Sequence, residues 1–94
     1  MTANSFTGTV KTDGDFELIE NVTTGSSFTG FTAGNMYTFQ VQHTADIKIA
    51  DAIFTLHNGF MYWKATDDDI YIKTDYSTTN DIGCILTILE TVVS

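Results

Sequence analysis

Three consecutive carboxylates, Asp67, Asp68 and Asp69, form the densest charged cluster in the sequence. Carboxylate oxygens are the ligands that calcium and other hard cations prefer. A calcium loop of the EF-hand type also needs alternating ligands, a central glycine and a distal glutamate, and the sequence around the cluster has none of these. Three adjacent side chains in one turn point in divergent directions. We therefore expect a solvated turn that holds no specific divalent ion.

The two histidines and the one cysteine are the other side chains with metal-binding or catalytic chemistry. A zinc site needs three or four ligands, and the acidic residues closest in sequence to His43 and His57 are Asp46 and Asp51. Cys84 lies in the most apolar segment of the chain, where a buried thiol is unreactive. Phosphate-loop, dinucleotide and nucleophile-elbow motifs are absent. The sequence therefore predicts a protein that is not an enzyme and has no metal and no cofactor.

Aromatic side chains suggest a binding surface rather than a catalytic one. Tyr62 and Trp63 are adjacent, and the alternation of a β-strand sends them to opposite faces, so they cannot form one platform. Trp63 is expected in the core. Phe60 and Tyr62 share the other face and are the better candidates for an exposed patch. That patch would bind a glycan or a protein partner, or would only support the surface of the sheet.

Charge restricts the partners further. The chain of 94 residues carries 12 acidic side chains against four lysines, with no arginine, and its formal net charge is −8. Phosphate neutralisation needs clustered cations, so nucleic acid and anionic membrane surfaces are disfavoured as partners. A single cysteine excludes an intramolecular disulfide. No apolar run approaches the length of a membrane span, and no signal peptide is visible at the first residues, which suggests synthesis in a cytoplasm.

The elements that must position these side chains are short strands separated by turn signals, the pattern of an all-β fold. We expect one domain over residues 1–94, an antiparallel β-sandwich of about seven or eight strands of jelly-roll or β-tulip type. Residues 1–5 are expected as a flexible N-terminal arm. The strongest local signal is Asn58-Gly59, the preferred two-residue hairpin turn, between 53–57 and 60–65. The predicted core contains Phe39, Phe54, Leu56, Trp63, Ile72 and Leu86.

The C-terminal run of residues 82–93 is apolar on both faces. Cys84, Leu86 and Ile88 alternate toward one side. Four other aliphatic side chains point the opposite way or extend the run to the chain end, and we expect them at an oligomer interface: Ile85, Leu89, Val92 and Val93. The alternative is that the first strand or the loop 75–81 covers this side.

The chain as a whole resembles the small capsid decoration and head-fibre proteins of tailed bacteriophages. The resemblance is carried by segments that span most of the chain: 6–10 (FTGTV), 31–41 (FTAGNMYTFQV), 69–74 (DIYIKT) and 84–88 (CILTI). It implies a β-sandwich without enzymatic activity that forms a homo-oligomer, often a trimer, on the outer surface of a capsid. Its partner would be the major capsid protein, and residues 1–5 would be the capsid-contacting arm.

Two functions of different classes therefore remain open. One is a structural protein of a bacteriophage virion, made in the host cytoplasm and bound to the capsid shell and to its own copies. The other is a small carbohydrate- or host-surface-binding module on the same fold.

Overall fold

The strands form where apolar and β-branched residues alternate with polar ones. The structure, a computed structural model, describes residues 2–12, 14–23, 30–74 and 83–92. Within these residues it contains six strands, one 3-10 helix and no α-helix. Their bounds are β1 Thr2–Val10, β2 Glu17–Leu18, η1 Ile19–Asn21, β3 Met36–Ile49, β4 Ala52–Lys64, β5 Ile70–Thr74 and β6 Cys84–Thr91. The all-β, antiparallel class expected from the sequence is confirmed.

The long β3–β4 hairpin is the largest element, and its turn is not the one that the sequence predicts. β3 and β4 pair from Met36↔Lys64 to Ile49↔Ala52, so the two-residue turn is Ala50-Asp51. Ala50 adopts a left-handed conformation there, with φ of 53°. The predicted hairpin at Asn58-Gly59 is wrong, because this dipeptide lies in the middle of β4.

Asn58 instead forms part of a β-bulge that bends the hairpin. The register shifts between Val41↔Gly59 and Thr44↔His57, so two residues of β3 face one residue of β4. His43 and Asn58 both have positive φ, 75° and 50°. The Asn58 Oδ1 accepts a 2.9 Å hydrogen bond from the His43 backbone N–H, which holds the two irregular residues together.

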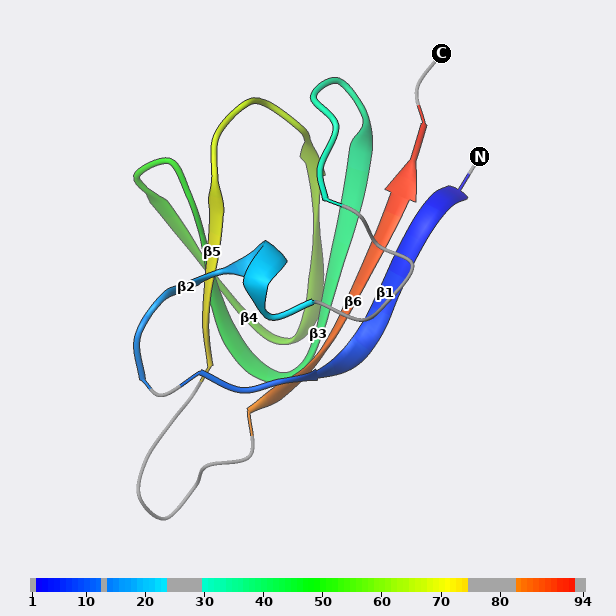
Figure 1. Cartoon of the computed structure of the whole chain (residues 1–94). Coiled ribbons are helices and arrows are strands. Elements are labelled where there is room, and N and C mark those ends of the chain that lie inside the picture. Colours follow the sequence, from blue (N-terminus) through cyan, green and yellow to red (C-terminus); the bar gives the residue numbers. More distant parts are fainter. Residues whose placement is uncertain (1, 13, 24–29, 75–82, 93–94) are drawn as a thin grey trace.

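The bulge divides one sheet into two halves. β4 pairs with β3 along its whole length, whereas β6 pairs with Met36–His43 of β3 and β5 pairs with Ala45–Ile49. The order is therefore β1-β6-β3-β5-β2, with β4 attached to β3. In Figure 1 the hairpin descends, bends near its middle and rises again toward its tip on the left, so the sheet is strongly curled. The strands do not separate into two independent sheets, because β3 and β4 continue through the bend.

The N-terminal part of the chain follows the same bend. β1 pairs with β6, from Thr2↔Thr91 to Val10↔Cys84, so residues 2–5, expected as an arm, belong to a strand. Beyond β1, the buried Thr12 and Thr74 exchange two 3.0 Å bonds, each backbone N–H donating to the other side-chain hydroxyl. β2 then pairs with β5. Gly83, just before β6, lies so close to Val10 that a Cβ on it would lie 2.3 Å from the Val10 carbonyl oxygen.

The core fills the concave side of the curled sheet. Its members come from both halves and from η1, whose Ile19 is fully buried. Among the predicted core residues, Phe39, Ile72 and Leu86 are fully buried, and Leu56 and Trp63 are partly buried against the cluster. Phe54 was predicted in the core but is 42% exposed, because it lies on the sheet-edge strand β4.

A buried polar network crosses the inner face beside the aromatic part of this core. The Glu90 carboxylate is 3% exposed. It accepts hydrogen bonds from the Tyr37 hydroxyl, from Asn4 Nδ2 at 2.8 Å and from Asn35 Nδ2 at 3.4 Å. The Thr32 backbone N–H donates to the Tyr37 oxygen at 2.6 Å. Burial disfavours ionisation of Glu90, but the three donors outweigh it and lower the pKa of its carboxyl. Burial and the bond to Glu90 raise the pKa of Tyr37.

We predict that Trp63→Ala lowers the free energy of unfolding by about 3 kcal/mol, because Trp63 packs against the rings of Phe31, Tyr37 and Phe39. Phe54→Ala is the matched control on the same strand, and it should cost about 1 kcal/mol or less because that ring is largely exposed. Urea denaturation measures both values. Equal costs for the two variants would contradict the assignment of Trp63 to the core.

We also predict that Glu90 makes the fold sensitive to acid. Its folded-state pKa is lowered, so its stabilisation is present above the unfolded-chain value of about 4.3 and is lost as pH falls through the folded-state pKa. Glu90→Gln should therefore lose stability at pH 7, by about 1–3 kcal/mol, and show a weaker decline in acid. Urea denaturation across the acid range gives the slopes. Glu17→Gln, at an exposed carboxyl, should keep the parent's slope; a parental slope in Glu90→Gln would refute this role.

Candidate functional site

The convex side of the first half of the sheet is a broad surface with almost no charge. We call it the outer face, and it consists of side chains from β1, β6, β3 and β4 that point away from the core. Across-strand pairing fixes its rows: Tyr62 and Leu89 both lie opposite Thr38, and Phe60 and Thr87 both lie opposite Gln40. Its members are Ser5, Thr7, Thr9, Met36, Thr38, Gln40, Gln42, Phe60, Tyr62, Lys64, Ile85, Thr87, Leu89 and Thr91. None is a carboxylate, although the chain carries a net charge of −8.

The aromatic pair predicted from the sequence lies on this face. Phe60 is 58% exposed and Tyr62 is 66% exposed. Their rings meet edge to face, with centroids 5.5 Å apart. Because they follow one another on the same side of β4, they present one continuous aromatic surface to solvent.

The aliphatic residues predicted at an oligomer interface lie close to this pair. Leu89 is exposed on the outer face and Ile85 is half-buried there. Val92 is exposed just after β6, and Val93 lies outside the described residues. β6 itself is hydrogen-bonded to β1 on one side and to β3 on the other. It therefore offers a face to a partner but no free strand edge.

The longest free edge within the described residues belongs to β4, a feature that the sequence analysis missed. β4 pairs only with β3 within the described residues, so one side of its 13-residue backbone has no strand partner there. It also carries four of the exposed large hydrophobic side chains: Ile53, Phe54, Phe60 and Tyr62. Phe54 is on the inner face, and Phe60 and Tyr62 are on the outer face. Ile53 lies opposite Lys48 and points away from the core in the second half of the sheet. Apolar residues on both faces of one long strand can indicate an exposed edge. The expected turn at Asn58-Gly59 divided this strand into two short ones, so the pattern was not recognised.

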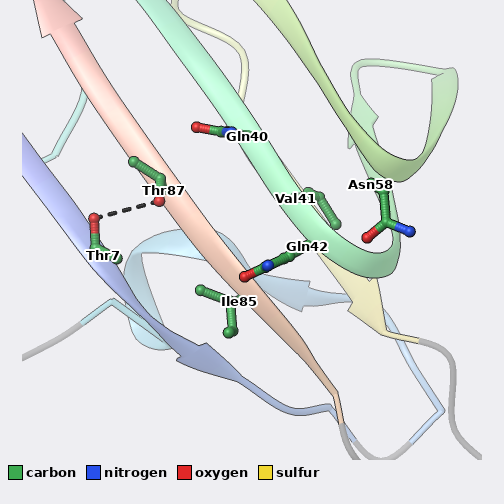
Figure 2. A pocket seen from close by; sticks show the side chains of 7 residues that line it. All are labelled: Thr7, Gln40, Val41, Gln42, Asn58, Ile85 and Thr87. Carbon is green, nitrogen blue, oxygen red and sulfur yellow. Dashed lines mark hydrogen bonds between the residues drawn. The ribbon is translucent and has the colours of Figure 1, made fainter.

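A hollow of about 560 Å³ opens on the outer face next to the bulge. Figure 2 shows its lining from all four strands, with the Thr7 hydroxyl bonded to that of Thr87 at 3.3 Å. Gln42 of β3 lies opposite Ile85 of β6, at the foot of the hollow. The complete lining is Thr7, Gln40, Val41, Gln42, Asn58, Ile85 and Thr87. Five of the seven lining residues therefore carry an amide or a hydroxyl group, and no ionisable side chain contributes.

None of the residues with catalytic chemistry lines the hollow. Cys84 is fully buried in the core, and burial raises the pKa of its thiol to about 11, so it is protonated at neutral pH. The His57 Nδ1 is 2.6 Å from the Thr44 hydroxyl, and His43 lies in the bulge. Asp68 bonds back to Thr66 in an exposed turn. In the described part of the chain, no three His, Cys, Asp or Glu side chains gather as metal ligands would.

Over the described ranges, the structure contains no helix with the length and apolar character needed to cross a membrane. No family model, no curated protein and no solved structure matches this chain.

Proposed function

We propose that this protein is a structural component of a bacteriophage virion that decorates the outer surface of the capsid. In this role it is made in the host cytoplasm, binds the major capsid protein and has no enzymatic activity. The proposal rests on the sequence resemblance to decoration and head-fibre proteins. The structural observation that favours it is β4, an edge strand with exposed apolar side chains on both faces. Such a strand suits a protein that works in contact with copies of itself.

The two halves of the curled sheet would serve as the two layers of a sandwich. Tyr37 and Phe39 from the first half and Ile47 and Ile72 from the second half belong to one core cluster. In orthogonal β-sandwiches, strands pass from one layer to the other through bulges or bends. The bulge at His43 and Asn58 is such a corner, and it supports the jelly-roll or β-tulip type of architecture.

Assembly into a closed ring accounts for both edges of the first half of the sheet. β4 and β1 are the two outermost strands of the first half, and neither has a second strand partner within the described residues. If the β4 edge of one copy pairs with the β1 edge of the next, the ring leaves no open edge in the first half of the sheet. A two-fold pairing of β4 with β4 would leave both β1 edges open. We therefore expect a ring, with the three copies that the resemblance implies.

Charge is compatible with this contact. The described side chains of β1 and β4 include no carboxylate, and Lys64 is the only lysine on the two strands. Copies with a net charge of −8 repel one another at long range, so a contact is least costly where carboxylates are absent. Exposed Leu89 and Val92 and half-buried Ile85 lie beside these edges and extend the apolar surface.

The second candidate function is a carbohydrate- or host-surface-binding module. The exposed pair of Phe60 and Tyr62 favours it, because aromatic rings present an apolar face against which the C–H groups of a sugar can pack. The two candidates are not exclusive, since a virion surface protein is displayed to the host.

We predict that the parent protein sediments as a trimer and that Ile53→Lys/Tyr62→Lys reduces it to a monomer. Both side chains are exposed in the isolated chain, so the substitutions leave the fold intact and place charge at the β4 contact. Sedimentation velocity measures the mass, and circular dichroism checks the fold. Asn21→Lys/Ala33→Lys makes the same change in charge at exposed positions off the strands and should remain a trimer.

Other results would identify a different contact. A monomeric parent overturns self-assembly, and a dimer overturns the ring in favour of two-fold pairing. If Ile85→Asp/Leu89→Asp dissociates the oligomer and the β4 variant does not, the copies meet through the face of β6. The virion assignment has its own test: mass spectrometry of purified particles produced by the same genome should detect this chain, and its absence from them would overturn that assignment.

A further inference from the structure

The geometry points to a binding site for a neutral oligosaccharide in the hollow beside the bulge. This inference deepens the second candidate function and does not depend on the virion assignment. The hollow lies over β1, β6 and β3, with Asn58 of β4 at its rim. Its volume of about 560 Å³ falls within the range of small-molecule sites, ~300–1,000 Å³.

The lining selects a polyhydroxylated ligand. Gln40, Gln42 and Asn58 each present an amide with both donor and acceptor groups, and Thr7 and Thr87 add two hydroxyls. Both glutamine side chains are exposed and make no hydrogen bond to the rest of the described chain. Sugar hydroxyls need this mixture of donors and acceptors, because each hydroxyl both donates and accepts.

An exposed aromatic ring outside the lining and one aliphatic lining residue flank these polar groups. Phe60 is the cross-strand neighbour of Gln40, and its ring contacts Tyr62. Ile85 forms part of the lining on the other side. A pyranose has one face of C–H groups and a rim of hydroxyls, so it can place the C–H face on Phe60 and the rim on the amides. Exposed aromatic rings next to glutamines therefore match the two surfaces of a sugar.

Charge excludes the other common ligand classes. No cation lines the hollow to bind a phosphate, sulfate or carboxylate group, and no anion lines it to bind a metal or an amine. The net charge of −8 also repels anionic ligands. The saccharide must therefore be neutral, without sialic acid or sulfate.

The bulge explains why the hollow occurs at this place in the sheet. β-Bulges interrupt the regular ladder and re-aim side chains, and they are frequent beside functional sites. Here the bond from His43 N–H to Asn58 Oδ1 fixes the Asn58 amide, so that its Nδ2 donors are held at the rim. The positive φ of two non-glycine residues is a local strain of the kind that is retained at binding sites.

The test titrates neutral trisaccharides of glucose, galactose and mannose into the 15N-labelled full chain, followed by NMR. At least one should bind with a Kd of about 1 mM or tighter and shift the amide signals of residues 40–42 and 85–87. Gln40→Ala and Gln42→Ala should each weaken that binding about tenfold, one good hydrogen-bonding partner being worth roughly this factor. Thr55→Ala, at an exposed hydroxyl elsewhere on β4, should bind like the parent.

Three outcomes would overturn the site. The first is that none of the three sugars binds at concentrations up to about 10 mM. The second is that sialylated or sulfated trisaccharides bind more tightly than neutral ones. The third is that both glutamine variants bind the sugar with the parent's affinity. The oligomeric mass of the same samples, measured by sedimentation, reports on assembly independently. An intact trimer that binds no sugar would overturn the sugar site alone, and a monomer that binds sugar would overturn the assembly alone.

Discussion

The division of one β3 edge between two different strands is the constraint on which the rest of this structure depends. A strand can satisfy two neighbours, and β4 occupies one side of β3 throughout. On the other side, β6 pairs with Met36–His43 and β5 pairs with Ala45–Ile49, so β3 must change its partner strand within two residues. The bulge at His43 and Asn58 lies at that change. It bends the sheet around the core, leaves β4 at an edge and opens the hollow on the convex side.

Local patterns in the sequence are sufficient for the class of the fold but not for its pairing. The alternation in 36–43, 70–74 and 84–88 predicts strands that the structure contains, because side-chain period and burial are local properties. Asn58-Gly59 misleads because asparagine tolerates positive φ in a bulge as well as in a turn. The real turn at Ala50-Asp51 contains no glycine, so its φ of 53° had no local signal. Which distant strands meet is decided by the shared core, which no short window contains.

The candidate site is likewise predictable where it depends on neighbouring residues of one strand, and not where it depends on the pairing of distant strands. Phe60 and Tyr62 could be placed on one exposed face from alternation alone. Their neighbourhood could not be predicted, because Gln40 and Thr87 reach them only through the pairing of β3 with β4 and β6. The hydrogen bonds of Glu90 could not be predicted either. The sequence places Glu90 in an apolar strand, but its three donors come from β1, the segment before β3 and β3 itself. A buried carboxylate with donors from three elements fixes how those elements meet, and it leaves the outer face free of negative charge.

The central place of β6 also determines the order in which the molecule can be completed. Among the described strands β6 is the last in the sequence, yet it lies between β1 and β3. On the ribosome, the β3–β4 hairpin can form as soon as Lys64 has emerged, whereas the nine residues of β1 have no neighbour until Cys84–Thr91 arrives. Bringing β1 and β6 together closes a loop of most of the chain, which is the slow kind of step in folding. Until then the apolar sides of β1 and β3 both face solvent, so the nascent protein is most vulnerable to proteases and to aggregation just before β6 docks.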